Sequence, residues 1–148
     1  MNYRTLMTVA AVLGFLSMSC SFGSGGSREL RMTASPDVPA AEGRATVSTT
    51  DNGNTKIDLV VKHLAPPENV NPGATVFVVW ARGSEKYADP QNLGALKVDS
   101  KLNGNISAAT NLRSFDLFVT AEPSQATTSP TGRTLLQTNV VMKSVNES

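Results

Sequence analysis

Few residues of this chain have side chains that could do chemistry. Its 148 residues include one cysteine, Cys20, and one histidine, His63. A catalytic triad needs a histidine that is held by an acid and aimed at a nucleophile, and His63 lies at the end of a predicted strand with no such partner in the pattern. One cysteine forms no disulfide within the chain, and with one histidine it cannot complete a tetrahedral zinc site.

The carboxylates are spread singly and lack the spacing of a calcium-binding loop. We expect them on solvated faces and in turn caps, and we expect Glu122, which precedes Pro123, to restrain the following turn. The net charge of +1 argues against nucleic-acid binding. The prediction is a protein that is not an enzyme, with no catalytic residue, metal, cofactor or small-molecule substrate. The carboxylates weighed are Asp51, Asp58, Glu85, Asp89, Asp99, Asp116 and Glu122.

Cys20 follows an apolar run near the N-terminus. Arg4 supplies a positive charge, residues 6–16 are apolar, and small residues precede the cysteine. This order is typical of a secretory signal peptide, here residues 1–19. The run is shorter than the roughly 20 residues of a membrane span, and an uncleaved anchor is the alternative.

Leu16-Ser17-Met18-Ser19-Cys20 resembles the lipobox of bacterial lipoproteins, although its leucine stands four residues before the cysteine instead of three. The resemblance implies that Cys20 is acylated and anchors the protein to the membrane. Because no aspartate follows Cys20, it also implies an outer-membrane lipoprotein facing the periplasm, with inner-membrane anchoring or secretion as alternatives. Residues 21–27 are rich in Gly and Ser, a composition typical of a flexible tether.

The remainder, residues 28–143, predicts one all-β domain, followed by a tail at 144–148. Apolar residues alternate with polar ones over short runs that are separated by Gly, Pro, Asn and Asp. Asn52-Gly53 and Asn103-Gly104 are hairpin signals, and the strand 75–81 is apolar on both faces. We expect an immunoglobulin-like Greek-key sandwich of seven or eight strands, or alternatively a small β-barrel. The predicted strands are 29–34, 43–50, 55–63, 75–81, 93–99, 105–109, 114–121 and 134–142.

A polar loop is predicted from Arg82 to Pro90, with Tyr87 near its middle. Loops on a rigid β scaffold commonly carry recognition, and Tyr and Arg are favoured at contact hot spots. Arg82 and Tyr87 are therefore the candidate binding residues.

Four segments in the second half resemble, in order, the extracytoplasmic C-terminal domain of bacterial anti-sigma-K factors. They are Val78-Val79-Trp80, Leu93-Gly94-Ala95-Leu96, the strand from Phe115 to Pro123, and Pro130-Thr131-Gly132. The resemblance implies a β-sandwich that senses or regulates outside the cytoplasm. We expect no counterpart of that family's sigma-binding region, since five residues, 1–5, stand before the apolar run.

Together these patterns predict a non-enzymatic, lipid-anchored, exported β-sandwich protein that binds or scaffolds an envelope protein through its loops or an edge strand. The alternative is an extracytoplasmic sensor or regulatory domain related to the anti-sigma-K outer domains.

Overall fold

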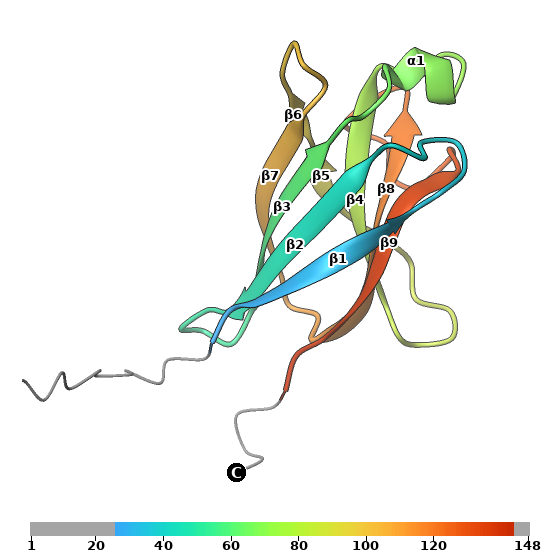
Figure 1. The fold of residues 1–148 in the computed structure, drawn as a ribbon. Helices are drawn as coiled ribbons and strands as arrows, with labels where there is room; N and C mark the ends of the chain where they lie inside the picture. Colours follow the sequence, from blue (N-terminus) through green and yellow to red (C-terminus); the bar gives the residue numbers. More distant parts are fainter. Residues whose placement is uncertain (1–25, 144–148) are drawn as a thin grey trace, which may run out of the picture.

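Nine strands form one antiparallel sheet in the computed structural model, which describes residues 26–143 (Figure 1). The predicted signal peptide, Cys20, most of the tether and the tail at 144–148 lie outside the described residues. The elements are β1 (Arg28–Ala34), β2 (Glu42–Thr49), β3 (Thr55–Lys62), α1 (Pro67–Val70), β4 (Val76–Gly83), β5 (Gln91–Ala95), β6 (Lys97–Val98), β7 (Gly104–Thr110), β8 (Ser114–Glu122) and β9 (Thr134–Val141).

The sheet curls until it is nearly a barrel. Its strand order is β5-β4-β8-β9-β1-β2-β3-β7-β6. β1 joins the two halves, because its first part pairs with β2 and Thr33 and Ala34 pair with β9. At the opposite seam the Thr110 hydroxyl donates to Gln91 Oε1 at 2.8 Å, linking β7 to β5. The predicted all-β class is confirmed, and the curled sheet agrees with the small β-barrel predicted as the alternative architecture.

Alternation along the strands places one set of side chains in a common core. In β3, Ile57, Leu59 and Val61 are buried, and in β2 Ala45 and Val47 face them in register. The burial therefore follows the alternation of apolar and polar residues from which the strands were predicted. The other strands add the remaining large buried side chains of this core, which include Phe77, Val79, Phe115, Leu117, Leu135 and Leu136.

β4 is buried on both faces, as its apolar run predicts. Phe77, Val79 and Ala81 belong to the main core, whereas Val78 and Trp80 form a second cluster with Phe118 on the outer side of the sheet. The segment between β8 and β9 returns to this outer side. Its carbonyls at Gln125 and Thr127 accept hydrogen bonds of 2.9 and 2.8 Å from Asn92, the β5 residue in register with Trp80.

The predicted strand 93–99 is wrong in one respect, because the structure divides it into β5 and β6. The side chain of Leu96 is buried between them, and its amide donates to the carbonyl of Phe77 at 2.9 Å. After this last contact with β4 the chain pairs with β7. This crossing raises the strand number to nine.

The hairpin at Asn52-Gly53 is confirmed: Thr49 pairs with Thr55, and Gly53 adopts a φ of 83°. The second hairpin exists, but its turn lies before the predicted dipeptide. Leu102 adopts the positive φ of 61°, and Gly104 is already a buried residue of β7. The loop expected after β3 contains one short turn of helix, α1.

Candidate interaction surfaces

The structure separates Arg82 from Tyr87. Arg82 belongs to β4, which extends to Gly83, and its guanidinium lies 5.2 Å from the ring centroid of Phe118. Arg82 thus covers the second apolar cluster by a cation–π contact. The predicted loop therefore begins after Gly83, since Gly83 still pairs with Phe115 in the ladder.

Tyr87 lies in the loop of residues 84–90, called the Tyr87 loop below. Its side chain is 84% exposed, and the ammonium of Lys86 lies 5.2 Å from its ring centroid. The loop is closed by the amide of Ala88, which donates to the carbonyl of Glu85 at 3.1 Å. The aromatic ring is thus held away from the core on a short turn.

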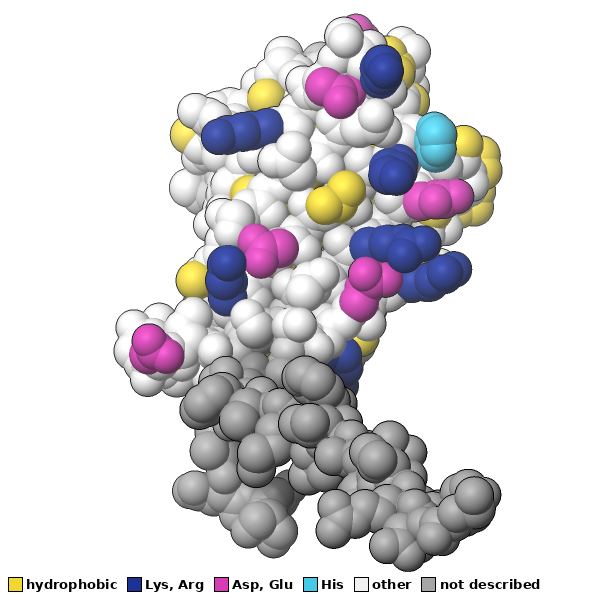
Figure 2. Space-filling view, turned by 60° about the vertical axis from the view of Figure 1, so that its left-hand side comes forward, with side chains coloured by type: hydrophobic (Ala, Val, Ile, Leu, Met, Phe, Trp, Pro, Cys, Tyr) yellow, Lys and Arg dark blue, Asp and Glu magenta, His cyan; other side chains and the backbone are white. Residues whose placement is uncertain are grey.

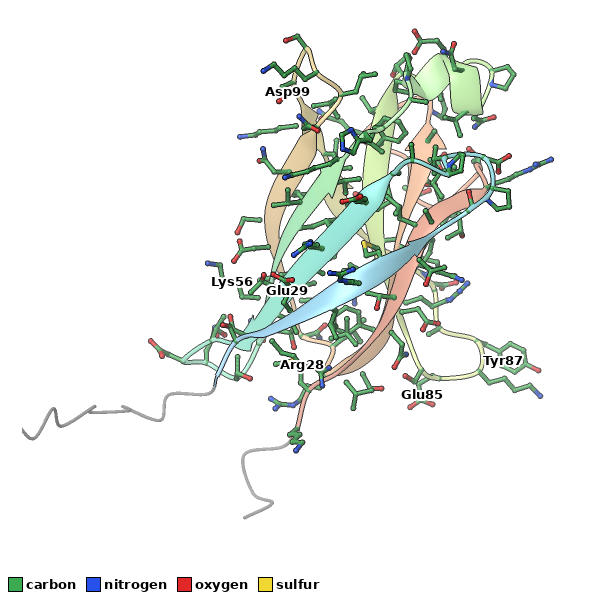
Figure 3. All side chains as sticks on the ribbon, viewed as in Figure 1. Arg28, Glu29, Lys56, Glu85, Tyr87 and Asp99 are labelled. Atoms are coloured by element: carbon green, nitrogen blue, oxygen red, sulfur yellow. The ribbon has the colours of Figure 1, made fainter. Side chains whose placement is uncertain are left out.

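The Tyr87 loop lies at the end of the molecule where the described chain begins. Ser84 Oγ lies 2.8 Å from Ser114 Oγ, Ser114 is in register with Val141, and the guanidinium of Arg28 donates to the carbonyl of Val141 at 3.0 Å. Figure 3 places Tyr87 and Arg28 in the lower part of the molecule and Asp99 at the opposite end. We call the end that holds Arg28 the tether end.

A second surface covers the outer side of β1, β2 and β3, and is called the Val60 face. Val60 is 45% exposed and is in register with Arg44, which is itself in register with Arg31. Directly opposed like charges in a sheet are destabilising, so this arrangement is unusual on a purely structural surface. A hollow of about 380 Å³ on this face is lined by Glu29, Glu42, Arg44, Thr46, Val60 and Lys62.

Basic and acidic side chains both surround Val60. Arg44 forms an exposed ion pair with Glu29 at 3.1 Å, and Glu42 is in register with Lys62. Figure 2 shows basic and acidic side chains interspersed over the face in view. Sequence reasoning missed this surface because it depends on the β1–β2 register, which no local pattern reports.

Glu122 departs from the expected solvated position at the start of a turn, because it is buried and its carboxylate binds residues at the far end of the segment between β8 and β9. Its carboxylate has no exposed surface and accepts hydrogen bonds from the Thr120 hydroxyl at 2.6 Å and the Gly132 amide at 3.1 Å. The amide and hydroxyl of Thr131 also donate to it. Thr120 in turn accepts from the indole of Trp80 at 2.9 Å. Three segments that are separate in the sequence, in β4, β8 and the turn before β9, therefore meet in one hydrogen-bonded network.

Three carboxyl groups are held in their charged form by hydrogen bonds. Burial raises the pKa of Glu122, but hydrogen bonds from Thr120, Thr131 and Gly132 together lower it below the ordinary value. A hydrogen bond from Ser107 lowers the pKa of Asp58. The amide of Asn103 lowers the pKa of Asp99 in the turn before β7.

His63 is exposed just after β3, with a φ of 58°, and its amide donates to Asn103 Oδ1 at 3.4 Å. Within residues 26–143, no group of three or more His, Cys, Asp or Glu side chains is placed to hold a metal ion. Two further hollows, of about 240 and 280 Å³, lie beside α1 and beside the β1–β9 pair.

No protein-family model matches this chain, and no curated protein matches its sequence. In the described part of the chain, every helix is too short or too polar to cross a membrane.

Proposed function

We propose that this protein is a non-enzymatic, lipid-anchored protein of the cell envelope that presents its β domain to a protein partner. The observation that carries the proposal is the position of Arg28. β1 begins there, at the tether end and eight residues after Cys20. Eight residues span at most about 29 Å, so acyl chains on Cys20 would keep the tether end near the bilayer.

The Val60 face is the surface that we assign to the partner. A partly exposed apolar side chain surrounded by charged groups has the apolar centre and polar rim of a small protein interface. On the Val60 face the cations Arg31, Arg44, Lys56 and Lys62 exceed the anions Glu29, Glu42 and Asp58 by one charge. The expected partner is an envelope protein with an apolar side chain and a slight excess of acidic groups on its contact surface.

The state of the carboxylates supports a non-enzymatic role. General acids and bases work best when their pKa lies near the operating pH, which for a carboxyl group requires a raised pKa. Glu122, Asp58 and Asp99 have lowered pKa values and accept hydrogen bonds that organise turns and strands. In this proposal the three charged carboxylates stabilise the fold and do not transfer protons.

The anchor is tested by replacing Cys20 with Ser in the full chain. We expect fatty-acid labelling to disappear and the protein to move from the membrane fraction to the soluble fraction. A Cys20→Ser variant that stays in membranes would contradict acylation, and would favour an uncleaved N-terminal anchor.

The partner surface is tested by photo-crosslinking in intact cells. A photoreactive residue at Val60 should give a discrete adduct with one envelope protein, whereas the same residue at exposed Gln137 on β9 should not. The substitutions Arg44→Glu and Lys62→Glu should reduce the Val60 adduct. Equal adducts from both positions, or none from Val60, would remove the Val60 face from the proposal.

A further inference from the structure

Tyr87 is the most exposed of the large hydrophobic side chains in the described residues. Val60, Val98 and Val141 are the others, at 39–49% exposed, against 84% for Tyr87. The described residues leave most of its ring uncovered, and its cationic neighbour is Lys86. A single turn between β4 and β5 thus projects an aromatic ring and an ammonium group into the surroundings.

The ladder determines the direction in which this loop projects. Gly83, the last residue of β4, pairs with Phe115, and the adjacent Ser114 pairs with Val141, to which Arg28 is hydrogen-bonded. The loop and the start of β1 therefore belong to the same end of the sheet (Figure 3). If the chain is anchored at Cys20, this end faces the bilayer.

Tyrosine and lysine suit the boundary between lipid and water. A tyrosine ring is apolar at its body and polar at its hydroxyl, and such rings are enriched at the headgroup level of membranes. A lysine stem can lie along apolar surface while its ammonium remains in water. Glu85 and Asp89 outnumber Lys86 and give residues 84–90 a net charge of −1, so burial of the ring, and not attraction to anionic lipid, would provide the contact.

We propose that the Tyr87 loop rests on the lipid headgroup layer and fixes the orientation of the domain relative to the membrane. This inference rests on the proposed anchor at Cys20. With two attachment points, the acylated cysteine and the loop, the turn before β7 and α1 face away from the bilayer. The Val60 face, on the side of the sheet, then stays accessible to a partner.

The test uses the acylated full chain, purified from membranes and reconstituted into phosphatidylethanolamine–phosphatidylglycerol vesicles with or without bromine on the acyl chains. Tyr87→Trp adds a fluorophore at the loop, and Lys101→Trp adds one at the opposite end as the matched control. The native Trp80 is fully buried and provides a constant background. Brominated lipid should reduce the fluorescence of Tyr87→Trp. The fluorescence of Lys101→Trp, and that of the unchanged chain, should be the same in brominated and unbrominated vesicles.

Equal emission of Tyr87→Trp in both lipids, with the protein still bound to vesicles, would overturn the inference and leave the anchor standing. Equal quenching at both positions would also overturn it, because the domain would then have no defined orientation. A photoreactive residue at Tyr87 that captures a protein instead of lipid would assign the loop to a protein partner. Failure of the unchanged chain to bind vesicles would instead defeat the proposed anchor.

Discussion

Glu122 shows how one residue can organise two distant parts of the chain. The carboxylate sits at the end of β8 without exposed surface, and its hydrogen bonds reach Thr131 and Gly132, which precede β9. A buried carboxylate is tolerated only when donors replace its lost water. Here hydroxyl and amide donors do so, and the turn of residues 130–132 is held against the barrel.

Replacing Glu122 with Gln should destabilise the fold. The new side-chain amide would place a donor group where Thr120, Thr131 and Gly132 already donate, so hydrogen bonds would be lost in a buried site. We expect a loss of about 3 kcal/mol in the free energy of unfolding, measured by urea denaturation at neutral pH. Glu68→Gln, at an exposed position on α1, is the matched control and should be nearly neutral. Equal stability of the Glu122→Gln variant and the unchanged chain would contradict a structural role for the charge.

The lowered pKa of Glu122 also predicts a pH dependence. Because the folded-state pKa lies below the ordinary value of 4.5, folding favours the charged carboxylate. The stabilisation is complete above about pH 4.5 to 5 and is lost as the pH falls through the folded-state pKa. Thermal unfolding from pH 7 down to pH 3 should therefore show the Tm difference between the unchanged chain and Glu122→Gln shrinking on the acid side. A difference that grows on acidification would contradict the sign.

Residue type alone identified part of the candidate surfaces. Tyr87 stands among polar residues, so its exposure could be predicted from the sequence. The separation of Arg82 from Tyr87 could not be predicted, because whether the strand stops before or after Gly83 depends on Phe115 in β8. The opposition of Arg31 and Arg44 depends on how residues 35–41 join two strands.

At the scale of elements, the signals that succeeded are local and those that failed depend on distant contacts. Gly53 takes up a positive φ within its own hairpin, and the alternation in β3 reports its own two faces. The break at Leu96 lies where the pairing changes from β4 to β7, two strands that are far apart in the strand order. No window of sequence around Leu96 contains that information.

The turn before β9 requires glycine at position 132 because two backbone segments meet there. A Cβ on Gly132 would lie 2.5 Å from the carbonyl oxygen of Ala121. Gly132→Ala should therefore displace the turn from Glu122 and cost about 1–3 kcal/mol of stability, in the range of overpacked sites. Thermal unfolding measures the loss. Gly26→Ala, where a Cβ meets nothing within 4 Å, is the control, and equal effects of the two substitutions would contradict the steric cause.

At the scale of the whole molecule, β1 determines whether the two halves of the sheet behave as one unit. Its pairing passes from β2 to β9 between Met32 and Thr33. Trp80 lies in the half that contains β4 and β8, far along the strand order from β2 and β3. The fluorescence of Trp80 therefore reports on this half of the sheet. It can be compared with far-UV circular dichroism, which reports on all the strands.

Met32 is the buried side chain at that junction, and its truncation should weaken both halves together. Met32→Ala removes core contacts and should cost about 2–5 kcal/mol. Because β1 is shared, Trp80 fluorescence and far-UV circular dichroism should report one coincident urea transition, at lower denaturant than in the unchanged chain. Val141→Ala, at a position 49% exposed, should change stability by no more than about 0.5 kcal/mol. A Trp80 transition that stays at its original midpoint while the dichroism signal falls earlier would contradict this expectation. It would show that the two halves unfold independently and that β1 does not couple them.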